Sequence, residues 1–550
     1  MRKVLVFFVT MVIVVLCMLS ASGQDKYVSK VWVADNGDGT YKNPILHADY
    51  SDPDAIRVGD NYYMVSSSFE DVPGLPILHS KDLVNWRIAG HALQRMPPYE
   101  HFSRPRHGEG VWAPAIRFRN NQFYIYYPDP DFGIYLVTAK NVAGPWTEPV
   151  LVEGGKGLID PCPFWDDNGL AYLVHGFAGS RAGIKSVIVI KKLNAAADKT
   201  IDAGKLVFDG HDNDPTLEGP KMYKRNGYYY IFAPAGGVST GWQLALRSKK
   251  IYGPYERKVV MDKGNSAVNG PHQGAWINTP AGEDWFLHFQ DKGMYGRVVH
   301  LQPMQWRNDW PVIGTDKDGD GKGEPVAVFK KPNVGKSYPL QTPAESDEFN
   351  SNEPGMQWQW QSNPKPVWLF SNPSKGIVRL FSEKIDSADN LWFASNVLQQ
   401  KFPAEEFSVT TKFNFTPNPK LQNEKAGLAV MGLNYASISM RSSKDGLSIV
   451  YAVCNEAEKR NAESETVIAK AVSSLIYFRV TVVSAGQCRF SYSFDGISFK
   501  EAADLFAATA GRWKGAKFGI FCTRQSQTND AGFVDVDWVR VESVANKQAQ

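Results

Sequence analysis

The feature that most constrains this 550-residue chain is a short pattern that occurs five times in its first 310 residues. Each copy opens on one conspicuous residue and continues into a hairpin whose turn is rich in Gly, Asn or Asp, which favour tight turns. The hairpins lie at 59–63, 120–124, 167–172, 225–229 and 282–286. The opening residues are Asp52, Trp112, Asp160, Glu218 and His272. A repeat of roughly 50–60 residues made of short strands is typical of β-propeller blades.

Equivalent positions in propeller blades face one central axis, so the opening residues are expected to converge there. A single acid before a proline-containing strand start is more often a turn cap than a functional group. Three acids at the same position of the repeat, Asp52, Asp160 and Glu218, instead favour a shared site. Grouped carboxylates push their pKa values apart, so that one holds a proton while another stays ionised. An acid and a base across one bond suit glycoside hydrolysis.

The rest of the patterning predicts an all-β protein with two domains. Period-2 alternation dominates, and helical periodicity is almost absent. We expect a five-bladed β-propeller over 36–326, a Pro- and Lys-containing linker over 327–346, and a β-sandwich accessory domain of jelly-roll or concanavalin-like type over 347–543. Aromatic residues make up 13% of the chain, which suits strands and also stacking on sugar faces.

The N-terminus is typical of a targeting segment. Arg2 and Lys3 precede an apolar run over 4–19, and small residues follow at 21–23. We predict a signal peptide over 1–23, export to the periplasm or the extracellular space, and no stable membrane insertion after cleavage. Residues 24–35 are expected to form a loose leader.

Charge and cysteine content exclude other classes of protein. The 60 basic and 57 acidic residues give a net charge of +3 without a basic tract, which argues against a nucleic-acid partner. Past the signal segment the cysteines follow no zinc-binding spacing. A disulfide and free buried thiols remain alternatives for Cys454, Cys488 and Cys522, and Cys162 stands alone.

A Gly- and Asp-rich stretch lies over 315–324. Asp316, Asp318 and Asp320 followed by Gly321 repeat the first half of a calcium-binding loop, but its twelfth position is Ala327 instead of a bidentate Glu. A partial cation site and a plain surface turn both fit this pattern.

A set of motifs in order gives a specific resemblance. The stretches 43–46, 50–54, 67–70, 78–86, 112–114, 160–161, 218–220 and 296–301 resemble glycoside hydrolase family 43 over the whole propeller region. The second domain resembles the concanavalin-like sandwich of the β-xylosidase-like branch. The resemblance implies an exo-acting, inverting hydrolase that removes a terminal pentose, α-L-arabinofuranose with narrow preference over β-D-xylose, from plant cell-wall polysaccharides or oligosaccharides. A non-catalytic carbohydrate-binding protein is the alternative, which the intact acids disfavour.

The resemblance also implies roles for individual residues. Asp52 would be the general base, Glu218 the general acid, and Asp160 the residue that tunes and orients that acid. Substrate-binding residues would be Arg297, Trp112 and Phe69, with core packing as the alternative for the two aromatic side chains. His272 would hold a central Ca²⁺ through water, and no other cofactor is expected.

Three carboxylates and one loop depart from this scheme. Asp54 adds a fourth acid next to Asp52, where many relatives have Ser. Glu70 and Glu109 are expected in surface turns, with a place in the pocket as the alternative. In xylosidase-like relatives a loop of the sandwich helps to close the pocket, but the sequence does not identify that loop here.

Overall fold

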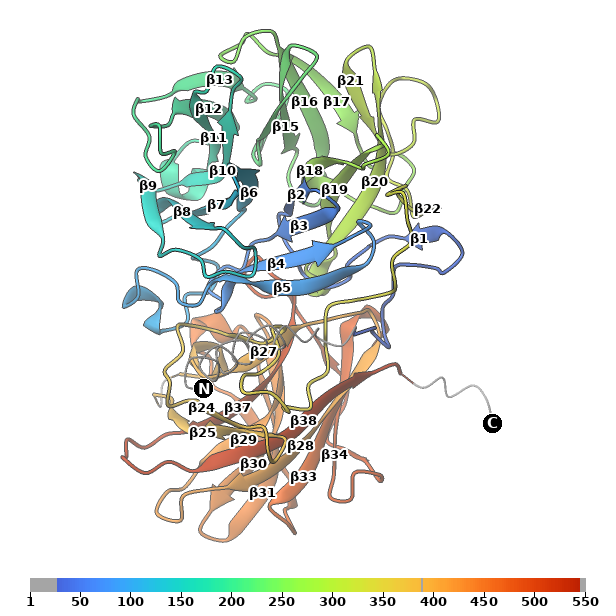
Figure 1. The fold of residues 1–550 in the computed structure, drawn as a ribbon. Coiled ribbons are helices and arrows are strands. Elements are labelled where there is room, and N and C mark those ends of the chain that lie inside the picture. Colours follow the sequence, from blue (N-terminus) through green and yellow to red (C-terminus); the bar gives the residue numbers. More distant parts are fainter. Residues whose placement is uncertain (1–26, 387–388, 545–550) are drawn as a thin grey trace, which may run out of the picture.

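The computed structural model describes residues 27–386 and 389–544. The predicted signal peptide lies outside the described residues. Figure 1 shows two β-rich domains, with the N-terminal one stacked on the C-terminal one. Among the described residues no helix is both long and apolar enough to cross a membrane.

The N-terminal domain is a five-bladed propeller, which confirms the predicted fold class. Each blade is one antiparallel sheet of four strands that are consecutive in the sequence. The first blade contains β2 (Asp54–Val58), β3 (Asn61–Val65), β4 (Gly74–Ser80) and β5 (Trp86–Leu93). The second contains β6 (Ala115–Arg119), β7 (Gln122–Asp129), β8 (Gly133–Ala139) and β9 (Val150–Gly154). The third contains β10 (Leu158–Trp165), β11 (Ala171–Phe177), β12 (Val187–Lys192), β13 (Lys205–Asp209), with the short helix α2 (Gly179–Ala182) between β11 and β12. The fourth contains β14 (Lys221–Arg225), β15 (Tyr228–Ala235), β16 (Trp242–Ser248) and β17 (Glu256–Met261). The fifth contains β18 (His272–Asn278), β19 (Asp284–Asp291), β20 (Arg297–Arg307) and β21 (Trp310–Ile313).

The repeat has this form because each predicted turn joins the first two strands of a blade. The hairpin between β2 and β3, for example, turns at Gly59, which has a φ of 60° that glycine adopts without steric cost. Apolar side chains of neighbouring blades pack together, and one buried cluster joins Val65 and Ile77 of the first blade to Ile116 and Ile125 of the second. Burial between blades therefore holds the ring together.

The ring closes through segments outside the blades. The strand β1 (Thr40–Lys42) pairs with β22 (Val328–Lys330), and Leu46 exchanges backbone hydrogen bonds with Val299 of the fifth blade. The expectation of a loose leader over 24–35 is wrong for its described part. Ser29 is buried and donates to Glu345, and the Trp32 indole donates to the carbonyl of Pro44. The segment predicted as a linker, 327–346, therefore packs against the propeller and the leader.

The C-terminal domain is a β-sandwich of two packed sheets, as the sequence predicts. One sheet contains β23 (Gln359–Trp360), β26 (Glu383–Lys384), β27 (Leu398–Lys401), β29 (Lys425–Met431), β30 (Tyr435–Ser443), β31 (Gly446–Cys454), β32 (Ser464–Lys470) and β37 (Lys517–Arg524). The other contains β24 (Leu369–Asn372), β25 (Ile377–Phe381), β28 (Phe407–Thr416), β33 (Leu475–Val483), β34 (Gln487–Ser493), β35 (Lys500–Glu501), β36 (Phe506–Ala507) and β38 (Phe533–Glu542). Strand β33 alternates strictly between buried and partly exposed residues, because one face of its sheet covers the core.

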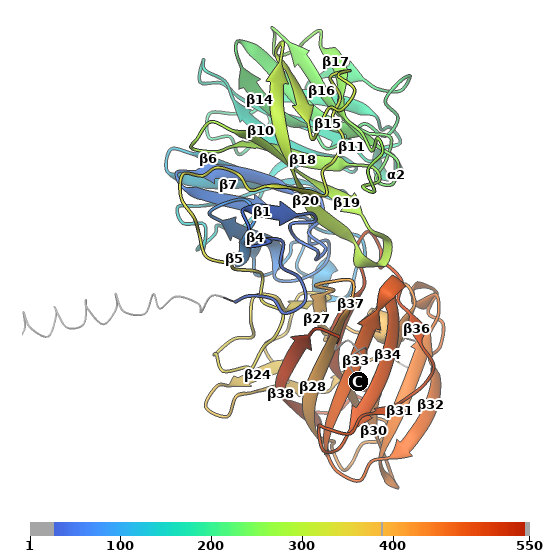
Figure 2. The same cartoon turned by 90° about the vertical axis from the view of Figure 1, so that its right-hand side faces the viewer.

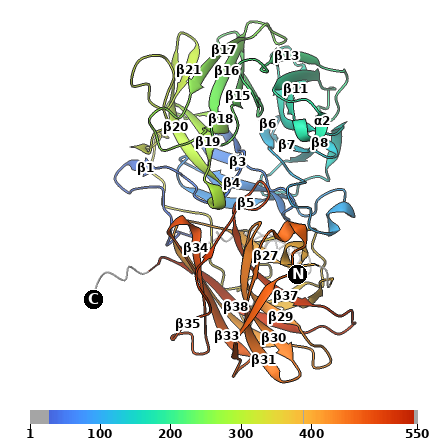
Figure 3. The ribbon, with the colours of Figure 1, turned by 180° about the vertical axis from the view of Figure 1, so that it is seen from behind.

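The two domains share an extensive interface. Val72 of the first blade forms a β-bridge with Trp360 of the sandwich, and the Gln399 amide donates to Asp71. The hairpin between β19 and β20 reaches toward the sandwich (Figures 2 and 3), where the backbone N–H of Ala516 donates to Met294. The sandwich therefore contacts the same blades that carry Asp52 and Arg297.

All four cysteines of the described residues are buried free thiols. The structure therefore decides between the two alternatives for Cys454, Cys488 and Cys522 in favour of thiols. Because each sits among packed side chains, it behaves as a small hydrophobic residue.

Replacing Asp54 with Ala is expected to lower the free energy of unfolding by about 3 kcal/mol. The fully buried Asp54 carboxylate accepts from the Arg117 guanidinium at 2.6 Å and from the Ile116 N–H at 2.8 Å, so its loss leaves a buried cation unpaired. Urea unfolding monitored by fluorescence measures the change. As a control, Asp60→Ala removes an exposed ion pair to Lys336 and should change stability little. Equal effects of both substitutions would contradict this role of Asp54.

Candidate functional site

Asp52 lies immediately before β2 in a left-handed conformation, with a φ of 54°. Asp tolerates this region better than most residues, and strained backbone of this kind often occurs at functional sites. The side chain is buried, and both of its oxygens accept from Arg297 Nη1, at 2.9 and 3.1 Å. Ser67 Oγ donates to Oδ2 at 2.5 Å. These donors suit an ionised carboxylate.

Asp160 lies in β10 at a break in the register with β11, also with a left-handed φ of 57°. Its buried carboxyl accepts from the Gly219 N–H at 2.8 Å and from the Gln273 amide at 3.4 Å. Burial raises the pKa of Asp160 to about 6, and the charge of Asp52 adds to this rise, whereas the Gly219 N–H and Lys221 oppose it. Asp160 therefore connects directly to the backbone next to Glu218.

Glu218 precedes β14, and its backbone N–H donates to the carbonyl of Pro234. The following Gly219 has a φ of 61°, and an added Cβ there would lie 2.9 Å from the Gln273 side chain, so glycine is required. Glu218 keeps 26% of its side chain exposed. Burial raises its pKa to about 8, and repulsion from Asp160 and Asp52 contributes in the same direction against the attraction of Arg297. At neutral pH Glu218 is therefore a protonated acid within reach of solvent.

His272 begins β18 and is 1% exposed, with Nε2 lying 3.5 Å from Glu218 Oε1. Burial lowers the pKa of His272 to about 3, and Arg297 and His288 contribute, so the ring is neutral. Neither ring nitrogen has a hydrogen-bond partner among the described residues. A buried nitrogen without a protein partner suits a water molecule, and hence an ion held through water.

Arg297 begins β20 and connects the acids to the sandwich. Burial would lower its pKa, but the carboxylates of Asp52 and Asp49 raise it overall, so the guanidinium stays charged. Asp49 accepts from the Arg297 backbone N–H at 3.0 Å and from the N–H of Gly515 in the sandwich at 2.8 Å. One carboxylate thus orders the arginine and the sandwich loop together.

Three aromatic residues lie where the propeller meets the sandwich. Phe69 is buried and left-handed, with a φ of 51°, and it pairs with Val111 just before Trp112. Trp112 is partly exposed, and its ring centroid lies 6.1 Å from that of Trp513 in an edge-to-face arrangement. Trp513 comes from the loop between β36 and β37 of the sandwich, and it is 49% exposed. A sandwich loop therefore approaches the propeller where the sequence predicts substrate-binding residues.

Trp513 and Asp49 are not predicted from the sequence. A single Trp between two glycines, Gly511 and Gly515, in a polar loop was a usable signal for an exposed aromatic residue. No local signal pointed to Asp49, because its partners lie in the fifth blade and in the sandwich.

The three remaining acids singled out in the sequence, Asp54, Glu70 and Glu109, all pair with basic side chains. Asp54 pairs with Arg117 in the second blade. The expectation that Glu70 lies in a surface turn is wrong, since its side chain is fully buried and contacts His107 and Lys514. Glu109 is partly exposed and pairs with His101 at 2.6 Å.

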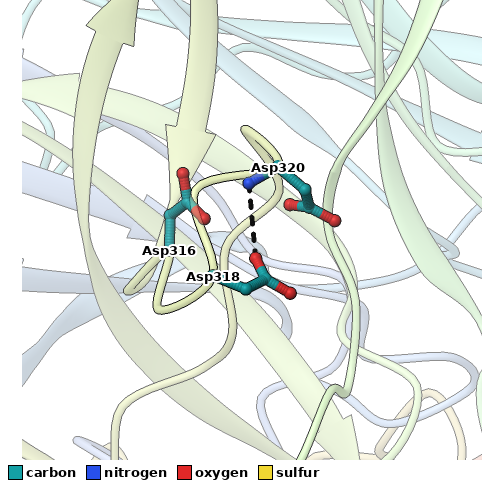
Figure 4. Close-up of side chains that lie close together, drawn as sticks. All are labelled: Asp316, Asp318 and Asp320. Carbon is teal, nitrogen blue, oxygen red and sulfur yellow. Dashed lines mark hydrogen bonds between the residues drawn. The ribbon is translucent and has the colours of Figure 1, made fainter.

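The Asp-rich loop after the fifth blade places three carboxylates together (Figure 4). Oxygens of Asp316, Asp318 and Asp320 lie within 4.8 Å of one another, the one group of three or more potential metal ligands found in the described ranges. Each of them also caps backbone N–H groups of the loop, and Asp316 pairs with Arg307. This geometry fits a self-capped turn as well as a cation site.

The central arrangement can perform acid–base chemistry on a bond placed between two carboxyl groups. Asp52 is held by an arginine and a serine, Glu218 retains a proton at neutral pH, and the charge of Asp160 helps to raise the pKa of Glu218 by repulsion. Acid–base chemistry requires that neighbouring carboxyl groups have different pKa values, and these environments provide that difference.

Comparison with known proteins agrees with this chemistry. Residues 41–311 match Glycosyl hydrolases family 43, and residues 346–542 match the Beta xylosidase C-terminal Concanavalin A-like domain. A putative beta-xylosidase of Xylanibacter ruminicola is 39% identical over 90% of this chain and 88% of its own. A non-reducing end alpha-L-arabinofuranosidase of Bacteroides ovatus is 30% identical over 71% of this chain and 73% of its own.

Solved structures show the same two-domain architecture. A family 43 protein from Bacillus licheniformis, 25% identical, has a TM-score of 0.78 and covers 92% of this chain and 100% of its own. The sequence resemblance, the five-bladed propeller with its attached sandwich, and the relatives agree. The chain therefore belongs to glycosyl hydrolase family 43, and it is a glycosidase.

Proposed function

We propose that this glycosidase removes a single pentose from the non-reducing end of a plant cell-wall polysaccharide or oligosaccharide, with inversion at the anomeric carbon. The observation that carries the proposal is the contrast between Glu218, whose pKa is raised to about 8, and Asp52, which accepts from Arg297 and Ser67. A proton donor and a proton acceptor are thus both present near pH 7. Trp112, Phe69 and Trp513 supply an apolar wall that suits one terminal sugar over a continuous chain.

β-D-xylose is the first candidate sugar and α-L-arabinofuranose the second. The sequence alone favoured arabinofuranose narrowly. The relative at 39% identity is named a putative beta-xylosidase, which shifts the preference toward xylose, whereas the arabinofuranosidase at 30% identity supports the second sugar. Export through the predicted signal segment would bring the enzyme to polymeric substrates.

In the mechanism that we propose, Glu218 donates its proton to the leaving glycosidic oxygen as the bond to the anomeric carbon breaks. Asp52 removes a proton from a water molecule that attacks the opposite face of that carbon, so a hydroxyl replaces the leaving group. Asp160 keeps the proton on Glu218 by repulsion and orients it through the Gly219 N–H. Arg297 orients Asp52 and reaches toward the sugar hydroxyls.

Replacing Glu218 with Gln is expected to lower kcat on a xylo-oligosaccharide by about a thousandfold, because an alkoxide leaves poorly without a proton. The loss on a 4-nitrophenyl glycoside should be smaller, since nitrophenolate leaves unprotonated. Asp52→Asn should lower activity on both substrates, because both need the activated water. Steady-state kinetics with the xyloside and the arabinofuranoside measure these changes and rank the two sugars.

The matched control is Glu256→Gln, which alters an exposed carboxylate paired with Arg247 on the rim of the fourth blade. It should retain full activity. Unchanged turnover in both Glu218→Gln and Asp52→Asn would contradict the assigned roles. Proton NMR should show the inverted anomer first, and a retained anomer would instead make Asp52 a nucleophile.

The pH dependence of kcat/KM should show a loss of activity as pH rises through about 8. The folded pKa of Glu218 is raised, so its proton is present below that value and is lost above it. Asp160→Asn should move this upper limb to lower pH, because the repulsion that favours the protonated form disappears. The exposed Asp167→Asn is the control. An upper limb at the same pH in Asp160→Asn would rule out this tuning.

We further propose a Ca²⁺ ion on the propeller axis, held through water by His272, whose buried ring nitrogens have no partner in the described protein. In chelator-treated protein, millimolar Ca²⁺ should raise the Tm of the wild type, and His272→Ala should abolish this rise. The double variant Asp318→Asn with Asp320→Asn should keep it. If the double variant alone loses the rise, the ion belongs to the Asp-rich loop, and the proposal for His272 fails.

A further inference from the structure

The walls of the proposed sugar pocket come from two domains, and one buried lysine lies between them. Glu70 and Asp71 directly follow Phe69, whereas Lys514 directly follows Trp513. Lys514 Nζ pairs with Glu70 Oε1 and lies 3.0 Å from Asp71 Oδ1. All three side chains are at least nine-tenths buried. A single ammonium group therefore connects the two loops immediately beside their aromatic residues.

The same connection continues to Trp112. Glu70 Oε2 accepts from the Gly108 N–H at 3.1 Å, and the Gly108 carbonyl accepts from the Trp112 indole at 3.0 Å. Gly108 also lies directly against the sandwich loop, since an added Cβ would come within 2.4 Å of Arg512 and 3.0 Å of Trp513. An unbroken chain of polar contacts thus runs from Lys514 through Glu70 to the indole that faces Trp513.

We propose that Lys514 is a positioning residue for substrate binding, which sets the spacing of Trp513 against Trp112 and Phe69 by binding Glu70 and Asp71 across the domain interface. This inference rests on the proposed function, because it assumes that these aromatic side chains contact the terminal sugar. Lys514 itself takes no part in proton transfer. Its loss should therefore weaken substrate binding more than it slows the chemical step.

The fold has other contacts that retain the two acids when Lys514 is replaced. Glu70 keeps His107 Nδ1 at 2.6 Å in addition to the Gly108 N–H, and Asp71 keeps Lys517 and the Gln399 amide. Neither carboxylate is left unpaired in a buried place, which is the situation that costs most. The contact that disappears is the one that anchors the Trp513 side of the loop.

The test compares Lys514→Met, Lys514→Arg and Lys425→Met. Lys425 pairs with Glu463 and Glu465 inside the sandwich, so it is a matched partly buried lysine with no contact to the site. On the better 4-nitrophenyl glycoside, Lys514→Met should raise KM about tenfold with kcat changed less than about threefold. Lys514→Arg should have a KM close to that of the wild type, because the charge is kept, and Lys425→Met should leave both KM and kcat unchanged.

A second measurement, limited proteolysis, tests the position of the loop that carries Trp513 independently of enzyme activity. Arg512 is about half exposed, so trypsin can cleave after it when the loop opens. Cleavage there, identified by mass spectrometry of the full-length protein, should be faster in Lys514→Met than in the wild type and unchanged in Lys425→Met.

The outcomes separate this inference from the function. An active wild type whose KM or cleavage rate does not respond to Lys514→Met overturns the positioning role and leaves the glycosidase assignment intact. Failure of Lys514→Arg to restore KM also overturns it. If the wild type is inactive on every pentoside, the proposed function is refuted. Faster tryptic cleavage of Lys514→Met would still support the role of Lys514 in holding the loop.

Discussion

The contact between Arg297 and Asp52 is the interaction on which the rest of the site depends. The guanidinium comes from the fifth blade and the carboxylate from the first, so the pair forms only when the ring is closed. Asp49 holds the Arg297 backbone and also accepts from Gly515, which extends the same constraint to the sandwich. Because buried charges are tolerated only when paired, closing the ring and docking the second domain complete one electrostatic network.

That network explains how three acids in one place acquire different protonation states. Asp52 receives the arginine, Asp160 receives a backbone N–H and an amide, and Glu218 is left with the neutral His272 as a neighbour. Burial raises the pKa values of Glu218 and Asp160, and repulsion from Asp160 and Asp52 raises that of Glu218 further. Burial, neighbouring charges and hydrogen-bond donors around each carboxyl, and not the residue type, determine which acid keeps its proton.

Much of this could be predicted from the sequence because repetition carries positional information. Hairpins with turns such as Asn226-Gly227 locate the blades, and the opening residues Asp52, Asp160 and Glu218 follow from their place in the repeat. The failures occurred where no periodicity exists. Glu70 was expected at the surface, although its charge is satisfied by Lys514, which lies 444 positions later in the chain. The leader near Ser29 was expected to be loose, although Glu345 holds it.

By itself, the sequence determined the all-β class, the five blades and the attached sandwich, and it singled out the three acids Asp52, Asp160 and Glu218. These properties follow from short-range patterns. Turn residues and the alternation of apolar and polar residues specify strands, and side chains at the same position of each repeat point in equivalent directions. Only the tertiary structure decided which donors surround each acid, that Asp54 pairs with Arg117, and that Trp513 faces Trp112. Those contacts join residues far apart in the chain, and their energies depend on burial and distance, which no local pattern contains.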